Sequence, residues 1–283
     1  MTKIKLENIS YVYGVGTPYE IHALDNINLD IKAGCVTGII GHTGSGKSTL
    51  MQLLNGLEKP TSGKVYLDGS DIWTYPKKIS QIRFKVGLVM QYPEYQLFEE
   101  TVAKDIAYGP TNMGLDKQEI DKRVLNAAQI VGLTSELLDK SPFDLSGGEK
   151  RRAAIAGVMA MTPDVLVLDE PAAGLDPVGR ATIFNAINKY RQETGATIII
   201  VSHSMEDMAR MCDDMVVMAG GRVIMTGKTE EVFSQAKVLA DNGLDVPEIS
   251  KLMLMLRERG ISLDSTPYTV SDALKIIKKE LRT

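Results

Sequence analysis

The sequence predicts an α/β fold in which a central parallel β-sheet is covered by helices. Residues 165–168 are a continuous apolar run, and residues 197–201 are apolar after their first residue; both have strand length, which indicates strands buried on both faces. Residues 178–190, between them, have the pattern of a helix. Parallel neighbours need a crossover connection, and a helix is the usual one, so this alternation favours a parallel sheet.

The first part of the chain predicts strands around a loop. Apolar Ile27, Leu29 and Ile31 alternate with polar neighbours, which is the period of a half-buried strand. Residues 14–18 interrupt the strand region 3–31 with a glycine-containing loop. The elements expected next are a strand, a glycine-rich turn, a helix and another strand, at residues 36–40, 41–46, 48–57 and 65–67.

The later parts of the chain predict two helical regions. Apolar residues recur at steps of three and four within 118–133, so a helical subdomain is expected at about 92–160. The same spacing returns in residues 249–256 and 270–277, which indicates two amphipathic helices. The expected domains are therefore a main domain and a small C-terminal helical module, at residues 1–235 and 236–283.

Composition excludes several classes of protein. The 283 residues are 44% hydrophobic and 24% charged, as in ordinary globular proteins. The net charge of −4 argues against sequence-independent binding of nucleic acid, which needs a dense basic face. The longest stretch without Asp, Glu, Lys or Arg has 14 residues, whereas a spanning helix needs about 20 apolar ones. No signal peptide is expected, and two cysteines make no disulfide framework, so a cytosolic location is predicted.

A phosphate-binding loop follows the strand at 36–40. The pattern G-x-x-x-x-G-K-[ST] is matched by Gly41, His42, Thr43, Gly44, Ser45, Gly46, Lys47 and Ser48. Its glycines let backbone N–H groups surround phosphates at a helix N-terminus. The lysine is expected on the β- and γ-phosphates, and the serine hydroxyl on Mg²⁺. The histidine occupies a variable position of the loop.

Two further elements face the same kind of ligand. Asp169 and Glu170 end an apolar strand, which puts them at the carboxyl edge of the sheet; the first is expected to hold Mg²⁺ and the second to activate water as a general base. The residues Ser146, Gly147 and Gly148 precede a helical pattern and form a second candidate anion site.

Along the chain the phosphate loop comes first, the Ser-Gly-Gly turn second and the two acids last. Three elements in this order resemble the nucleotide-binding subunits of ATP-binding cassette transporters, in which Leu-Ser-Gly-Gly-(Gln/Glu) is the signature sequence. The resemblance covers about residues 3–235. It implies a P-loop ATP-binding cassette core with an antiparallel β subdomain and an α-helical signature subdomain. The signature here ends in Glu149 instead of the commoner Gln, and little effect on phosphate binding is expected.

The resemblance also implies roles for isolated residues. Gln91 matches the glutamine that contacts Mg²⁺ and water, and His203 matches the histidine on the γ-phosphate. Asp176 lies in a sequence similar to the loop that joins the two nucleotide sites of a cassette dimer. Tyr13 matches the aromatic residue that stacks on adenine, with Tyr11 as an alternative on the same strand face. Thr49, beside the phosphate loop, completes the expected ATP-binding set.

Residues 91–98, 41–44 and 51–57 resemble the corresponding segments of the energy-coupling factor transporters, which import vitamins and trace metals. Residues 14–20 and 243–248 resemble the second of that family's two ATPase subunits. This similarity implies ATP and Mg²⁺ as ligands and a second ATPase subunit as partner, in a heterodimer or a homodimer. It also implies an integral membrane coupling subunit, a substrate-binding membrane subunit reached indirectly, and a place at the cytoplasmic face of the membrane.

The sequence argues against several other classes of protein that contain a phosphate-binding loop. DNA-repair and chromosome ATPases insert long segments between loop and signature, but Lys47 and Ser146 are only 99 residues apart. A GTPase should contain Asn-Lys-x-Asp, and the sequence at Asn188 lacks the aspartate. The remaining alternatives are an ATPase of another transporter and a regulatory cassette without turnover. Intact Glu170 and His203 argue against the latter.

Two segments keep two interpretations each. Pro93 is expected to end a strand and hold Tyr92 extended. Tyr95, Leu97 and Phe98 then either plug the junction with the helical subdomain, or part of residues 92–98 lies in a groove for a helix of the membrane partner, with Glu94 at its rim facing a basic residue of that helix. The C-terminal helices either pack on their own domain or stabilise pairing of the two ATPase subunits.

Overall fold

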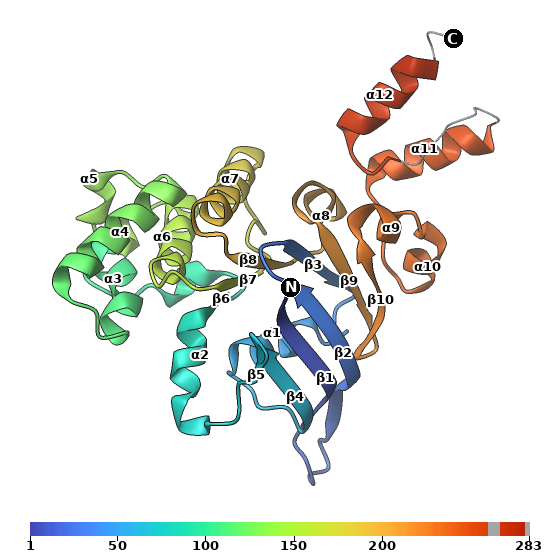
Figure 1. The fold of residues 1–283 in the computed structure, drawn as a ribbon. Helices are drawn as coiled ribbons and strands as arrows, with labels where there is room; N and C mark the ends of the chain where they lie inside the picture. The colour runs from blue at the N-terminus through green and yellow to red at the C-terminus, as the bar shows by residue number, and fades with distance from the viewer. Residues whose placement is uncertain (260–266, 281–283) are drawn as a thin grey trace.

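A computed structural model describes residues 1–259 and 267–280, and its centre is a six-stranded sheet (Figure 1). The strand order is β10-β9-β3-β8-β7-β6, in which only β10 pairs antiparallel with its neighbour. The strands are β3 (Val36–Gly41), β6 (Val86–Val89), β7 (Val165–Asp169), β8 (Thr197–Val201), β9 (Asp214–Ala219) and β10 (Arg222–Lys228). The parallel α/β prediction is confirmed.

Both faces of this sheet are buried, in separate hydrophobic clusters. Along β7, Leu166 and Leu168 belong to one cluster, whereas Val165 and Val167 belong to the other. Successive side chains of a strand point to opposite faces, so a strand covered on both sides must be apolar throughout. This is why β3, β7 and β8 lack the alternation of exposed strands, and all their residues are buried.

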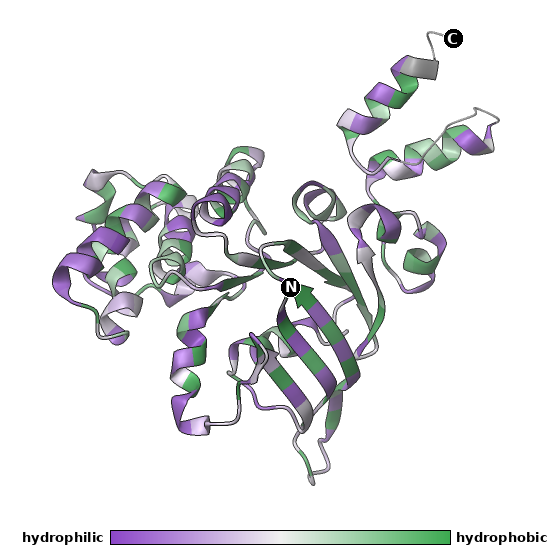
Figure 2. Ribbon diagram, in the orientation of Figure 1, coloured by the Kyte–Doolittle hydropathy of each residue, from purple (hydrophilic) through white to green (hydrophobic). Residues whose placement is uncertain are grey.

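A second, antiparallel sheet covers one face of the central sheet together with helix α1 (Lys47–Asn55). Its order is β2-β1-β4-β5, and Figure 2 shows hydrophobic and hydrophilic residues alternating along these strands. The alternation arises because one face of this sheet packs on the core and the other faces solvent. The strands are β1 (Thr2–Tyr13), β2 (Ile21–Lys32), β4 (Ser62–Leu67) and β5 (Ser70–Asp71).

Helices α3 to α6 gather on one side of the molecule, beyond β6 (Figure 1). The helices from α2 to α8 are α2 (Ile79–Lys85), α3 (Val102–Asn112), α4 (Lys117–Val131), α5 (Ser135–Leu138), α6 (Gly147–Met159), α7 (Pro177–Thr194) and α8 (Met205–Met211), with short 3₁₀ turns η1 (Pro76–Lys78), η2 (Pro93–Gln96) and η3 (Pro142–Asp144). The apolar faces of α3, α4, α6 and α7 join the larger cluster on the second face of the sheet. Among the described residues, every helix is too short or too polar to cross a lipid bilayer.

The described residues of the C-terminal part form four helices, and the pair predicted from spacing lies outermost (Figure 1). They are α9 (Thr229–Phe233), α10 (Ala236–Asp241), α11 (Glu248–Glu258) and α12 (Val270–Glu280). Met253 and Ala273 form a small cluster between α11 and α12, whereas Leu252 and Leu274 are 46% and 51% exposed. Sequence patterns missed α9 and α10 because helices this short have no full amphipathic repeat.

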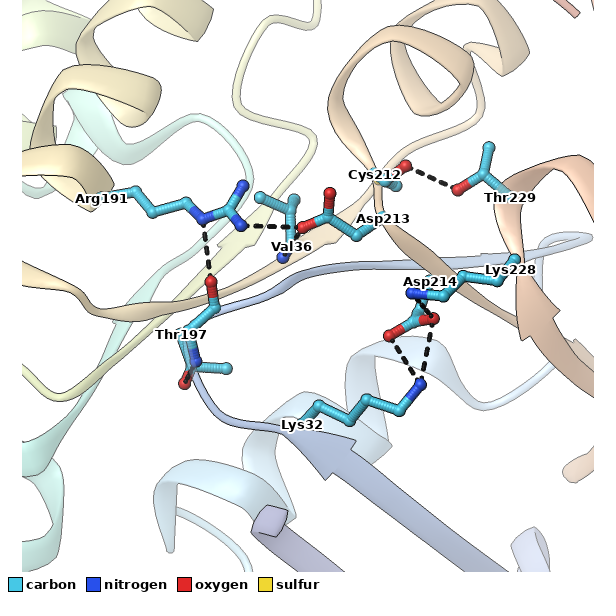
Figure 3. Close-up of polar contacts among 10 residues, drawn as sticks. Lys32, Val36, Arg191, Thr197, Cys212, Asp213, Asp214, Lys228 and Thr229 are labelled. Atoms are coloured by element: carbon cyan, nitrogen blue, oxygen red, sulfur yellow. Dashed lines mark hydrogen bonds and ion pairs between the residues drawn. The ribbon is translucent and has the colours of Figure 1, made fainter. Parts of the chain in front are cut away.

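Charged side chains connect elements at the amino-terminal edge of the central sheet (Figure 3). The Asp214 carboxylate lies 3.1 Å from Nζ of Lys32 and 2.9 Å from Nζ of Lys228, which come from β2 and β10. Beside it, Asp213 lies 2.9 Å from the guanidinium of Arg191 at the end of α7. This edge is opposite the one where the glycine-rich loop lies, so these ion pairs belong to the scaffold and not to the site.

Candidate active site

An open pocket of about 520 Å³ lies at the carboxyl ends of β3, β7 and β8. This is the edge at which open α/β sheets bind ligands. Eleven of the predicted site residues line it, together with three that were not predicted. The lining residues are Tyr13, Ile21, His22, Ala23, Thr43, Gly44, Gly46, Lys47, Ser48, Thr49, Gln91, Asp169, Glu170 and His203.

The glycine-rich loop exposes the N-terminus of α1 to this pocket. Gly46 is the N-cap, and because it has no side chain the first N–H groups of the helix stay available for an anion. Its φ of 99° suits glycine, and a Cβ there would lie 2.6 Å from Leu24 Cδ2. At Gly41, a Cβ would lie 2.5 Å from the hydroxyl of Ser45. The loop conformation therefore needs glycine at positions 41 and 46, and it packs around the buried side chain of Ser45.

Lys47 is held within the loop by main-chain carbonyls. Its ammonium donates to the carbonyl oxygens of Gly41 at 2.7 Å and of His42 at 3.0 Å. Burial lowers the pKa of this lysine, and the charges of Asp169 and Glu170 oppose that effect. The side chain of His42 itself is exposed and does not line the pocket, as its variable position suggested.

The two acids at the end of β7 have different surroundings. Asp169 is 9% exposed, and burial together with the charge of Glu170 raises its pKa to about 6, against the opposing effect of Lys47. Glu170 has a φ of 47°, and its carboxylate accepts hydrogen bonds from the backbone N–H of His203 at 2.7 Å and from the hydroxyl of Ser202 at 3.1 Å. The carboxylate of Glu170 is thus oriented by the two residues that follow β8.

Three oxygen donors in the pocket fit a hard divalent cation. Ser48, Gln91 and Asp169 supply a hydroxyl, an amide oxygen and a carboxylate, which Mg²⁺ prefers. A cation beside the buried carboxylate of Asp169 would stabilise its charged form. Mg²⁺ is usually held by few protein groups together with substrate phosphates.

The structure separates Tyr13 from Tyr11. Tyr11 is 9% exposed, and its hydroxyl donates to Glu58 at 2.5 Å. Tyr13 is 38% exposed and lines the pocket, with its hydroxyl 3.1 Å from that of Thr49. Only Tyr13 therefore offers its ring to a ligand.

Sequence patterns missed the residues opposite this tyrosine. Ile21 pairs with Tyr13 across the β1–β2 hairpin, and His22 pairs with Val12. Together with Ala23, these residues form the pocket wall beside the tyrosine. Pairing the two predicted strands around the loop at 14–20 would have put Ile21 at the pocket.

The remaining predicted residues lie outside this pocket. Ser146 caps α6, and Glu149 accepts hydrogen bonds from its N–H at 2.9 Å and its hydroxyl at 2.6 Å, in a capping box. Gly147 and Gly148 open that helix. Asp176 caps α7 by accepting from the N–H of Gly179 at 2.6 Å. Within a single chain, the N-termini of α6 and α7 therefore lie outside the pocket that contains Lys47.

The segment after Gln91 differs from what its sequence predicted. Tyr92 is not extended but left-handed, with φ 55° and ψ 56°. This turn places its ring centroid 5.5 Å from the guanidinium carbon of Arg151, and it carries Glu94 to the same group. Contacts with Arg151 therefore outweigh the extended preference of a residue before proline.

Glu94 is also not a free acid at a rim. Arg151 of α6 donates to its carboxylate from Nη2 at 2.6 Å and from Nε at 3.0 Å. The basic counterpart therefore lies in the same chain, 57 residues away. Burial raises the pKa of Glu94, but the hydrogen bonds from Arg151, a backbone hydrogen bond and the charge of Arg151 together outweigh burial and leave the pKa below its usual value.

A groove of about 370 Å³ runs beside this segment. Its walls are mostly apolar and come from α3, α6 and the chain after η2; they include Leu97, Phe98, Tyr108, Val158 and Met161. Of the residues expected to plug the junction, only Leu97 is buried, whereas Tyr95 and Phe98 are 85% and 56% exposed.

Comparison with known proteins gives consistent matches. The ABC transporter family model matches residues 24–173. The chain is 52% identical, over 279 residues, to the energy-coupling factor transporter ATP-binding protein EcfA2 of Caldanaerobacter subterraneus, covering 99% of this chain and 98% of that protein. It is 53% identical, over 281 residues, to the protein of the same name from Clostridium acetobutylicum, with the same coverage.

Solved structures agree with these matches. The cbiO1 structure from Clostridium perfringens, part of the ABC transporter complex cbiONQ, has a TM-score of 0.76 and 43% identity, covering 89% of this chain and 99% of that chain. A dimeric bacterial ABC transporter cassette has a TM-score of 0.71 and 31% identity, covering 80% of this chain and 98% of its own.

Proposed function

This chain belongs to the ABC transporter family, as an energy-coupling factor ATP-binding subunit, and from that premise we propose how its pocket hydrolyses ATP to drive the uptake of vitamins or trace metals. The chain is an ATPase. The observation that carries the proposal is that Lys47, on the phosphate loop, and Glu170, an oriented carboxylate, share one pocket.

ATP enters the pocket with its base against Tyr13 and its phosphates on the loop. The N–H groups at the start of α1 and the ammonium of Lys47 bind the β- and γ-phosphates. The two carbonyls that now accept from Lys47 are weaker partners than a phosphate, so the lysine exchanges them on binding. His203, at the pocket wall, contacts the γ-phosphate.

Glu170 acts as the general base. It accepts a proton from a water molecule whose oxygen attacks the γ-phosphorus, while the bond from that phosphorus to the β–γ bridging oxygen breaks and leaves ADP and phosphate. Lys47 neutralises charge that develops on the phosphate oxygens. Ser48, Gln91 and Asp169 would hold Mg²⁺, which supplies further neutralisation of phosphate charge when it is bound.

A second ATPase subunit completes each site. ATP lies between one chain's phosphate loop and the other chain's signature, a proposal that the family resemblance supports. The location of Ser146 and Asp176 outside the pocket supports this, because their helix starts are available to a second cassette, in a heterodimer or a homodimer.

The membrane component contacts the groove beside residues 92–98. Exposed Tyr95 and Phe98 at a mostly apolar groove support a docking site for a helix of an integral membrane coupling subunit. The chain then lies at the cytoplasmic face of the membrane, a location that the resemblance to this transporter family supports. The subunit that binds the transported substrate is then reached only indirectly.

The test is Glu170→Gln in the assembled transporter, with the second subunit's own ATP site disabled. The amide keeps the size of the carboxylate and removes the base, so ATP binding should persist while turnover slows by roughly 10²–10⁴-fold. Lys47→Ala should instead weaken nucleotide binding, since it removes charge-assisted hydrogen bonds to phosphate. Wild-type phosphate release by Glu170→Gln would rule out the assignment of the base. Absence of phosphate release from the wild-type complex would favour a regulatory cassette.

A further inference from the structure

We propose that Ser202 is a positioning residue for Glu170, and this rests on the role of Glu170 in the proposed function. Ser202 follows the last residue of β8 and is 4% exposed. Its hydroxyl donates to Oε2 of Glu170 at 3.1 Å. Ser202 does not line the nucleotide pocket, so it reaches the reaction only through the glutamate.

The direction of this hydrogen bond is set by the next residue but one. The backbone N–H of Ser204 donates to the Ser202 hydroxyl oxygen at 3.1 Å. The hydroxyl has a single proton, and the ionised carboxylate of Glu170 can only accept. With its oxygen accepting from Ser204, the serine directs that proton to Glu170.

Both carboxylate oxygens of Glu170 therefore accept hydrogen bonds from the two residues that follow β8. Oε1 accepts from the backbone N–H of His203 at 2.7 Å, and Oε2 accepts from Ser202. The backbone bond alone would leave the carboxylate able to rotate about its terminal torsion, because such torsions have broad minima. The second bond fixes the plane of the carboxylate, and with it the lone pairs that are available to a water molecule.

A further set of contacts keeps Ser204 in place. Its hydroxyl accepts from the N–H of Asp207 at 3.3 Å and from Nη1 of Arg180 at 3.4 Å. Arg180 also donates to the carboxylate of Asp207 at 3.1 Å, and that aspartate is 5% exposed. The support of Glu170 therefore extends through α8 to the first turns of α7.

The first test is Ser202→Ala, measured in the assembled transporter with the second subunit's ATP site disabled. Loss of the orienting bond should lower kcat roughly 10-fold, because misorientation of a general base slows only the chemical step. The KM for ATP should stay within about twofold, since Ser202 does not touch the nucleotide. Ser250→Ala is the matched control: it removes another buried hydroxyl, 1% exposed, which donates to Pro267 in the C-terminal part, and it should leave kcat unchanged.

The second test needs no turnover. The chain has three histidines, so ¹⁵N-histidine labelling of the full chain gives three backbone amide signals, from His22, His42 and His203. Removal of the Ser202 hydroxyl should shift the His203 signal by more than a Ser-to-Ala change of the preceding residue causes by itself, because its N–H donates to the carboxylate that is released. The other two signals are internal references. Ser250→Ala should shift none of the three.

The outcomes separate this proposal from the proposed function. Wild-type kcat in Ser202→Ala, or a fall in kcat without movement of the His203 amide, overturns the positioning role. If Glu170→Gln hydrolyses ATP like the wild type, the base assignment fails, while a shifted His203 amide in Ser202→Ala still supports the orientation of the carboxylate. If the alanine variant does not fold, Ser202→Cys replaces it, because cysteine is nearly isosteric with serine and is a weaker donor. This variant is expected to lose part of kcat and to shift the His203 amide in part. Wild-type kcat together with a wild-type His203 signal would overturn the proposal.

Discussion

The guanidinium of Arg151 donates two hydrogen bonds to the carboxylate of Glu94, from Nη2 at 2.6 Å and from Nε at 3.0 Å. The same guanidinium donates from Nη1 to the carbonyl of Ala173, in the chain after β7. The Arg151 side chain is 3% exposed. The buried guanidinium of Arg151 therefore connects the segment beside the proposed membrane groove to the chain that follows Asp169 and Glu170.

Glu94→Lys is expected to destabilise the fold, because Glu94 pairs with Arg151 of the same chain. Two cations would then meet at a buried site, and breaking such a pair costs about 3–5 kcal/mol of unfolding free energy. Glu94→Gln keeps an acceptor for Arg151 and should cost less. Urea denaturation of the three proteins, with ATP binding and assembly measured on the same preparations, checks this. A stable Glu94→Lys protein that fails only in assembly would contradict it.

Tyr13→Ala is expected to weaken ATP binding, because stacking of a base on an aromatic ring contributes about 1–3 kcal/mol. Tyr13→Phe keeps the ring and loses only the contact with Thr49, so its affinity should stay close to wild type. Tyr11→Phe is the control: it removes the hydrogen bond to Glu58 and should lower stability without changing affinity. Calorimetric titration with ATP measures all three, and an equal loss in Tyr11→Phe would argue against Tyr13 as the stacking residue.

Asp214 should stabilise the fold in a pH-dependent way. Burial raises its pKa, but hydrogen bonds from Lys228 and Lys32 outweigh that effect and leave the pKa below the ordinary value. A lowered pKa in the folded state stabilises the protein above the unfolded pKa of about 4, and the effect is lost as pH falls through the folded value.

The variant Asp214→Asn tests this. Since both lysines are more than half exposed, the expected loss at pH 6 is roughly 1 kcal/mol of unfolding free energy. The difference from wild type should shrink at pH 3, below the unfolded pKa, because the carboxylate of the unfolded chain then binds a proton more readily than that of the folded protein. Urea denaturation at the two pH values measures it, with Asp30→Asn, at an exposed position of β2, as the control. An equal loss at both pH values would show that charge is not the cause.

Deletion of residues 248–283 is expected to weaken pairing of the ATPase subunits and to leave the core folded. The cut follows Pro247 because Leu244 and Val246 are 8% and 6% exposed and belong to the main core. Light scattering measures pairing, and thermal unfolding measures the core. Unchanged pairing would favour a purely packing role for α11 and α12.

A surface variant refines that experiment. Leu252→Ser combined with Leu274→Ser changes two exposed apolar side chains of α11 and α12 while their shared cluster stays intact. Leu125→Ser, at a 59% exposed position of α4, is the matched control. Weaker pairing in the first protein alone would locate the contact on these helices.

Much of this protein follows from its sequence alone, because the relevant patterns are local. Uninterrupted apolar runs at β7 and β8 predicted strands buried on both faces, and the helix between them required a parallel sheet. The phosphate loop was equally predictable, because its glycines and lysine act within one turn between β3 and α1.

Tertiary structure alone decided what depends on contacts between distant segments. Strand register brought Ile21 opposite Tyr13, and the packing of α6 gave Glu94 an internal partner and turned Tyr92 left-handed. Ser202 is bonded to Glu170, although 32 positions separate them. Spacing along a chain specifies which face of a helix or strand a residue occupies, but two polar groups find each other only once the elements have packed. Such pairings, and with them the orientation of the Glu170 carboxylate, therefore become visible only in the folded molecule.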